Sequence, residues 1–140
     1  MKIDGSCHCG NITFTFDWPG TFPGMAARVC SCGFCQRHGG THTSHPDGAL
    51  TARIAEPDEV NRYEFGTKTA TFYVCRRCGV EPFVTSEIDG HLYAVVNVNC
   101  FEGVDREAIL RSDADFEDED LERRLARRAK TWIAKVNIAS

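Results

Sequence analysis

The stretch Thr-Ala-Thr-Phe-Tyr-Val-Cys-Arg-Arg-Cys-Gly, residues 69–79, joins a strand pattern directly to a pair of cysteines. Residues 69–74 are β-branched and aromatic, which is the composition of a β-strand. The pair that follows, Cys75 and Cys78, has the spacing at which two thiolates bind one metal ion, and Gly79 permits the tight turn that this needs. The stretch therefore predicts a strand whose end is held by a metal.

A closed tetrahedral zinc site needs four ligands, and this pair supplies two of them. Cys7 and Cys9, followed by Gly10, lie near the other end of the chain and can supply the remaining two. Both side chains of a C-x-C pair reach one ion only if the backbone between them turns, and the glycine makes that turn easier. We therefore expect Cys7, Cys9, Cys75 and Cys78 to form a structural zinc site.

Three further cysteines, Cys30, Cys32 and Cys35, lie within six residues of sequence. If the other four close one site, this trio forms a second site with three protein ligands. Three ligands and one open position are the arrangement of a catalytic zinc. The alternative is a second structural site, in which His38 or His42 provides the fourth ligand. Both interpretations predict two zinc ions per chain.

The compartment is inferred from the cysteines and the N-terminal segment. No apolar stretch follows Lys2, so we expect no signal peptide and a reducing cytoplasm, where structural disulfides are rare. Eight cysteines in such a chain are typical of metal ligands. The lone Cys100 is expected to be a small buried apolar residue. A disulfide-redox role for Cys75 and Cys78 is weaker, because no βαβ unit surrounds them.

Composition and charge exclude several classes of protein. The 140 residues are 42% hydrophobic and 26% charged, which is typical of one globular domain spanning 1–140. The net charge of −4 argues against nucleic acid as a partner. No apolar run approaches the roughly 20 residues that cross a bilayer, so no membrane role is expected. The sequence leaves open whether the chain forms a homo-oligomer.

Hydrophobic periodicity predicts a mainly β fold of short antiparallel strands, with one C-terminal helix. Strands are predicted at 11–16, 26–30, 60–65, 69–74 and 91–98. Glycines at 33, 39 and 40 favour a loop behind the cysteine trio. Apolar residues at helical spacing predict a helix over about 117–136, whose arginines are expected to form a solvated face. The β core is expected to span about 3–103.

Four motifs resemble those of the glutathione-dependent formaldehyde-activating enzyme family, also described as S-(hydroxymethyl)glutathione synthase, which includes centromere protein V-like proteins. They are Cys-His-Cys-Gly-Asn-Ile-Thr-Phe at 7–14, Cys-Ser-Cys-Gly-Phe-Cys-Gln-Arg at 30–37, Cys-Arg-Arg-Cys-Gly-Val-Glu-Pro-Phe at 75–83 and Val-Asn-Val-Asn-Cys at 96–100. The resemblance covers roughly residues 3–103.

This resemblance implies an all-β, tent-like fold that holds two zinc ions. The structural ion would bind Cys7, Cys9, Cys75 and Cys78, and the catalytic ion would bind the trio at 30–35. The implied activity is that of a carbon-sulfur lyase, which joins formaldehyde and glutathione to give S-hydroxymethylglutathione. The histidine-rich stretch at 37–46 departs from what we expect of the founding enzyme. It is compatible with another small thiol, another aldehyde or an extra ligand.

The chemistry of a three-thiolate site favours sulfur as the nucleophile. Such a zinc is a poor Lewis acid toward water, but it suits a further thiolate and lowers the pKa of that thiol. Sulfur would then attack the aldehyde and form a hemithioacetal, whose alkoxide needs a proton. We expect His38 to act in this transfer, with His42 and His45 as further candidates.

Glutathione carries two carboxylates, for which arginine forks are suited. Arg37, two residues past Cys35, is the expected substrate-binding residue, ahead of Arg28 and Arg53. Two other functions stay open on the sequence alone. One is a non-catalytic binding module stabilised by zinc. The other is metal storage or redox sensing by the cysteine trio.

Overall fold

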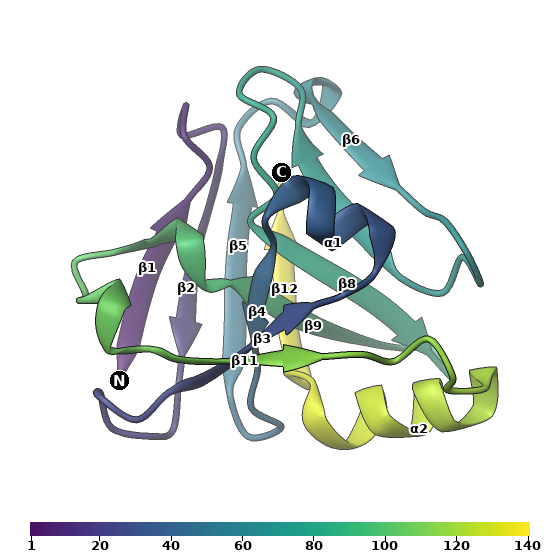
Figure 1. The fold of residues 1–140 in the computed structure, drawn as a ribbon. Helices are drawn as coiled ribbons and strands as arrows, with labels where there is room; N and C mark the ends of the chain where they lie inside the picture. Colours follow the sequence, from purple (N-terminus) through teal and green to yellow (C-terminus); the bar gives the residue numbers. More distant parts are fainter.

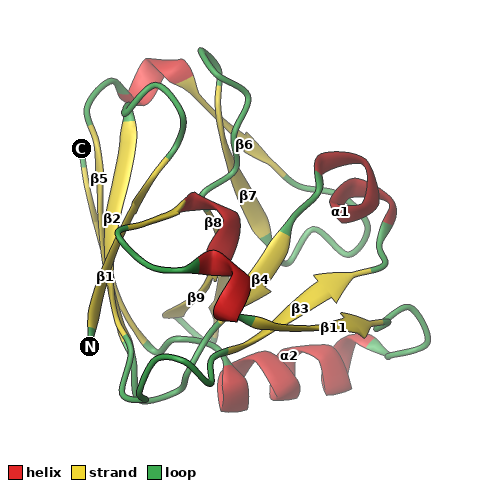
Figure 2. Cartoon of the chain, turned by 60° about the vertical axis from the view of Figure 1, so that its left-hand side comes forward, coloured by secondary structure: helices red, strands yellow, loops and turns green.

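The computed structural model describes residues 1–140 and consists of two β-sheets with two α-helices, α1 and α2 (Figure 1 and Figure 2). Five strands form the first sheet, in the order β10-β1-β2-β5-β12. Their bounds are β1 Lys2–Ser6, β2 Ile12–Asp17, β5 Ala49–Ile54, β10 Phe101–Glu102 and β12 Lys135–Ala139. The predicted mainly β fold with a C-terminal helix is confirmed.

Seven strands form the second sheet, in the order β11-β3-β4-β9-β8-β7-β6. Their bounds are β3 Ala26–Cys30, β4 Thr41–Thr43, β6 Val60–Tyr63, β7 Thr71–Cys75, β8 Phe83–Ile88, β9 His91–Asn97 and β11 Leu110–Ala114. The helices are α1 Gly33–His38 and α2 Leu121–Thr131, and short 3-10 turns are found at Pro57–Glu59, Val98–Cys100 and Arg106–Ala108. None of the helices has the length and apolar character needed to span a bilayer.

The main core lies where alternating residues of the two sheets meet. In β2, Ile12, Phe14 and Phe16 are buried while the residues between them face outward, as the alternation predicts. Phe83 and Val96 of the second sheet belong to the same cluster of 21 buried residues. These apolar side chains stabilise the fold by leaving water.

One glycine in this core is required by a close approach between neighbouring strands. Gly5 of β1 pairs with Phe14 of β2, and a Cβ at position 5 would overlap the phenylalanine ring. A larger residue at this position would displace the ring from the core.

Strands β8 and β9 are buried on both faces, because a second apolar cluster lies on the far side of the second sheet. Cys35, Phe72, Val84, Val95 and Trp132 form it. These residues come from α1, three strands and the segment after α2. This second cluster lies at the candidate functional site.

Two strand pairs are parallel, which departs from the predicted antiparallel architecture. Strand β11 runs parallel to β3 and β12 runs parallel to β5, each at the edge of its sheet. Both partners lie far away in sequence, so no hairpin turn marks these pairs. The ordered β structure therefore extends well beyond the expected limit of about residue 103.

The C-terminal helix is shorter than the predicted range of 117–136. Asp120 caps its N-terminus by accepting a hydrogen bond from the backbone N–H of Arg123. The helix ends at Thr131, because Ile133 exchanges two backbone hydrogen bonds with Ala94 of β9. The chain then continues as strand β12. Val136 therefore lies in a strand, although its spacing from the preceding apolar residues also fits a helix.

The segment behind the cysteine trio is a helix, α1, where the sequence favoured a loop. Cys32 caps its N-terminus by accepting a hydrogen bond from the backbone N–H of Cys35. Gly39 ends it in the left-handed region, with a φ of 79°. The glycines that indicated a loop, Gly33 and Gly39, thus lie at the two ends of a short helix.

We expect Phe16→Ala to lower the free energy of unfolding by about 3–5 kcal/mol, because it leaves a cavity between the sheets. Leu110→Ala, at a strand position that is 63% exposed, should change it by no more than about 0.5 kcal/mol. Urea denaturation of both variants measures the difference. Equal effects at the two positions would contradict the assignment of the core.

Candidate functional site

The structure brings Cys7, Cys9, Cys75 and Cys78 together, with all four sulfurs within 4.8 Å of one another. The Sγ atoms of Cys9 and Cys75 are 3.5 Å apart, and those of Cys7 and Cys9 are 3.8 Å apart. Tetrahedral coordination with Zn–S bonds of about 2.3 Å separates the sulfurs by about 3.8 Å. The four thiols are thus placed to bind one metal ion.

Two tight turns position these four sulfurs. Gly10 and Gly79 have φ values of 86° and 78°, in the left-handed region, and each closes the turn after a cysteine. The backbone N–H of Gly79 donates to the carbonyl of Cys75 at 2.8 Å. The backbone N–H of Ile12 donates to Cys7 Sγ at 3.3 Å, which helps to hold that sulfur. The predicted role of glycine in both turns is confirmed.

The trio Cys30, Cys32 and Cys35 also converges, with its three sulfurs within 4.8 Å of one another. Cys30 ends β3, Cys32 is the N-cap of α1, and Cys35 lies buried in the first turn of that helix. All eight cysteines of the chain are free thiols. The trio offers a second group of donors that fits a metal ion.

Hydrogen bonding within the trio shifts the pKa values of its thiols in opposite directions. A hydrogen bond with the Cys35 thiol lowers the pKa of Cys30 to about 5, against the opposing effect of burial, and the backbone N–H of Cys32 adds to it. The same bond, together with burial, raises the pKa of Cys35 above its usual range. Cys30 is therefore the member of the trio that ionises first.

The histidines are near the sulfurs but belong to neither group of donors within 4.8 Å. His42 is buried in β4, and its Nε2 lies 2.8 Å from Oε1 of the fully buried Glu81. His38 Nε2 lies 3.0 Å from the carbonyl oxygen of Gly79, and its ring stacks on Phe34. Neither ring has a nitrogen within 4.8 Å of all three sulfurs of the trio, so the structure does not group a histidine with them. The Nδ1 atom of His45 accepts a hydrogen bond within its own turn.

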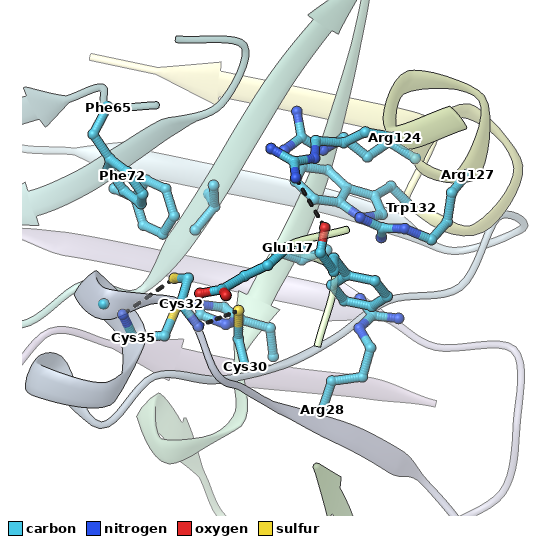
Figure 3. Close-up of a pocket in the computed structure, with 16 residues that line it drawn as sticks. Arg28, Cys30, Cys32, Cys35, Phe65, Phe72, Glu117, Arg124, Arg127 and Trp132 are labelled. Atoms are coloured by element: carbon cyan, nitrogen blue, oxygen red, sulfur yellow. Dashed lines mark hydrogen bonds between the residues drawn. The ribbon is translucent and has the colours of Figure 1, made fainter. Parts of the chain in front are cut away.

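A cavity of about 380 Å³ opens beside the trio, and its volume is in the range of small-molecule sites. Its walls combine cysteine, apolar and basic side chains with one carboxylate, that of Glu117 (Figure 3). The apolar part of the lining consists of Phe65, Phe72, Val84, Val95, Phe116 and Trp132. His42 lines this cavity, whereas His38 and His45 do not.

The basic side chains of the lining are ones that the sequence patterns favoured less, or did not indicate, as substrate-binding residues. Arg37, the expected substrate-binding residue, is exposed on the outer side of α1. It donates a hydrogen bond to the carbonyl of Gly33 at 3.1 Å. Arg53 is exposed on β5, in the other sheet. Arg28 does line the cavity, together with three arginines of α2 that were expected to face solvent. These three are Arg124, Arg127 and Arg128. Their spacing of three and four residues along one helical face is the signal that points to them.

A carboxylate at the start of α2 positions two of these arginines. Glu119 accepts hydrogen bonds from Nε and Nη2 of Arg127 at 2.9 and 3.1 Å, which is a bidentate pair. The guanidinium of Arg127 also lies over the Phe116 ring, 3.7 Å from its centre. Arg124 donates to the carbonyl oxygen of Phe116 at 2.9 Å. These contacts hold α2 against the loop that borders the cavity.

The fold and the site define a small, cysteine-rich β protein with two groups of sulfurs suited to metal ions and one adjoining cavity. Residues 2–116 match the family described as glutathione-dependent formaldehyde-activating enzyme, and the chain belongs to this family. The match includes all eight cysteines and ends before α2. The crystal structure of a Rhodobacter sphaeroides protein is 27% identical and covers 78% of this chain and 99% of that chain, with a TM-score of 0.57.

We expect Glu119→Gln to lower the free energy of unfolding by about 2 kcal/mol near neutral pH, because Arg127 loses its charged partner. Hydrogen bonds from Arg127 hold the pKa of Glu119 below its ordinary 4.5. The stabilisation from the ionised carboxylate is therefore complete above 4.5, and it is lost as the pH falls through the lower pKa of the folded state.

The measurement is urea denaturation of wild type and variant at pH 7 and at about pH 3. The difference between them should shrink at the lower pH. Glu64→Gln, at an exposed residue, is the control and should have little effect at either pH. A difference of the same size at both values would contradict the charge-based explanation.

Proposed function

We propose that this protein condenses formaldehyde with the thiol of glutathione to form S-hydroxymethylglutathione, as a carbon-sulfur lyase. The observation that supports the proposal most directly is the meeting of three sulfurs, from Cys30, Cys32 and Cys35, at a cavity bordered by apolar and basic side chains. The family to which the chain belongs is named for the same pair of reactants.

The reaction balances without an oxidant or reductant. The glutathione sulfur forms a bond to the formaldehyde carbon, and the carbon-oxygen double bond becomes a single bond. The thiol loses one proton, and the alkoxide that forms gains one. The protein therefore has to favour the thiolate, hold the aldehyde against it and supply a proton.

Zinc is the metal that we assign to both groups, because sulfur-only donor sets of three and four cysteines are typical of it. The four cysteines Cys7, Cys9, Cys75 and Cys78 would hold a structural ion. The trio would hold the second ion, which supplies the positive charge that lowers the pKa of a thiol bound in the cavity.

The remaining tasks fall to side chains of the cavity wall. Phe65, Phe72 and Trp132 exclude water from the hemithioacetal product. Of the three candidate histidines, His42 is the one that lines the cavity, and its contact with Glu81 fixes its ring orientation. We therefore assign the proton transfer to His42 in place of His38, which faces the other side of α1. A cytoplasmic location agrees with eight unpaired cysteines.

Metal content provides the first test. Wild type should contain two zinc ions per chain, and Cys35→Ser and Cys75→Ser should each lose one of them, because each removes a ligand from a different group. Native mass spectrometry counts the ions. Cys75→Ser should also melt at a lower temperature than Cys35→Ser, since its site joins the two sheets.

Cys100→Ser is the matched control, because Cys100 is buried but belongs to neither group of sulfurs. It should retain both ions. A wild-type protein with fewer than two ions, or a Cys35→Ser variant that keeps two, would contradict the division into groups of four and three.

Turnover provides the second test. With ¹³C-formaldehyde and glutathione, NMR should show S-hydroxymethylglutathione forming faster with wild type than in buffer. Cys35→Ser should reduce this rate to that of the uncatalysed reaction, because the trio is broken, while Cys100→Ser should leave it unchanged. A wild-type rate equal to the rate in buffer would refute the proposed reaction.

A further inference from the structure

Two arginines that line the cavity have no acidic partner. Arg28 of β3 donates only to the hydroxyl of Ser44, at 3.5 Å. Arg128 of α2 donates from Nη1 to the hydroxyls of Thr69 and Ser86, at 2.9 and 3.2 Å. A guanidinium that leaves water is normally compensated by a carboxylate. Here both guanidinium groups meet only neutral oxygens.

Arg128 is the more deeply buried of the two, with 8% of its surface exposed, and its Nε–H has no partner. The Nε1–H of Trp132 is likewise buried and unpartnered. The Arg128 guanidinium lies 5.0 Å from the centre of the Trp132 ring, so these two residues are neighbours on the cavity wall. Both of these nitrogens are covered and do not face the cavity. Nη2 of Arg128 also makes no hydrogen bond but is not covered, so it is the donor that an anion in the cavity can reach.

The charges around this wall are mixed, because four arginines and the carboxylate of Glu117 line the cavity together. Burial, together with the charges of Arg127 and Arg124, lowers the pKa of Arg128 to about 10. Glu119 offsets the charge of Arg127 through its bidentate pair but makes no contact with Arg28 or Arg128. The four arginines outnumber the two carboxylates, Glu117 in the lining and Glu119 beside it, so the wall keeps an excess of positive charge that favours an anion.

The cavity thus has two chemically different ends. The sulfur trio lies at one end, and Arg124, Arg127 and Trp132 lie at the other, with Glu117 between them, as the close-up shows (Figure 3). A ligand that spans the cavity needs a thiol at one terminus and a negatively charged hydrogen-bond acceptor at the other. The second end comes largely from α2, which lies beyond the residues that match the family.

We propose that Arg28 and Arg128, the latter positioned by the Trp132 ring, bind an anionic group of the substrate thiol, a carboxylate or a phosphate. This specificity site rests on the proposed function, because it assigns the far end of the same cavity. It selects thiols that carry a negative charge and rejects neutral thiols of similar size, whose binding would leave the two guanidinium groups without a charged partner.

The test is calorimetric titration of the zinc-containing, full-length protein, without formaldehyde, with two pairs of thiols. Glutathione is compared with its diethyl ester, and 4′-phosphopantetheine with pantetheine. Wild type should bind the charged member of at least one pair about tenfold more tightly or better, the contribution of a charge-assisted hydrogen bond. The pair that shows the preference identifies carboxylate or phosphate as the anion.

Arg28→Gln and Arg128→Gln should each remove most of that preference, and Trp132→Phe should reduce it by a smaller factor. Arg123→Gln is the matched control, because this arginine belongs to the same helix but is exposed and pairs with Asp120. It should retain the wild-type preference. If Arg128→Gln fails to fold by circular dichroism, Arg28→Gln and Trp132→Phe decide the question.

Equal binding of charged and neutral thiols by wild type would overturn the proposal, and so would an undiminished preference in Arg28→Gln. The failure of the proposed function is a separate result. An arginine-dependent preference without any turnover of formaldehyde would refute the reaction and leave the anion site standing. Turnover with a KM for the charged thiol of the preferred pair that does not change in Arg28→Gln would refute the anion site alone.

Discussion

Four cysteine sulfurs from the two sheets meet at one point, and this contact constrains the rest of the molecule. Cys7 and Cys9 border strands β1 and β2 of the five-stranded sheet, whereas Cys75 and Cys78 lie at the end of β7 in the seven-stranded sheet. Their convergence joins the two sheets at one end, next to the core in which Phe16 and Phe83 are buried. Sheets held in this way keep β8 and β9 in the middle, with an apolar cluster on each face.

The cavity depends on that arrangement, because its floor is the outer face of the same two strands. Val84 and Val95 provide the floor, and the chain crosses it twice, once as β3 with α1 and once as β11 with α2. In both views of the ribbon, β3 and β11 pass between the two helices (Figure 1 and Figure 2). The sulfur trio and the arginines thus reach one cavity from segments that are nearly 100 residues apart in sequence.

Local patterns predicted the parts of the site that are encoded locally. The spacing of the cysteines and the glycines after Cys9 and Cys78 indicated the two groups of sulfurs, and the alternation in β2 indicated a half-buried strand. Long-range pairing left no such mark, so β11 and β12 were missed and the helix was extended through Ile133. Proximity in sequence also favoured Arg37 over Arg28. A short helix turns Arg37 outward, whereas β3 places Arg28 at the cavity.

The parallel pairing of β11 and β12 has a consequence for the order in which the molecule is completed. Both strands add to sheet edges after every other strand of those sheets has been synthesised. The sulfur trio can form as soon as β3, β4 and β9 have met, but Arg128 and Trp132 arrive only when the last segment docks on Ala94. A nascent chain would thus bring its three sulfurs together before the arginines of α2 and Trp132 reach the cavity.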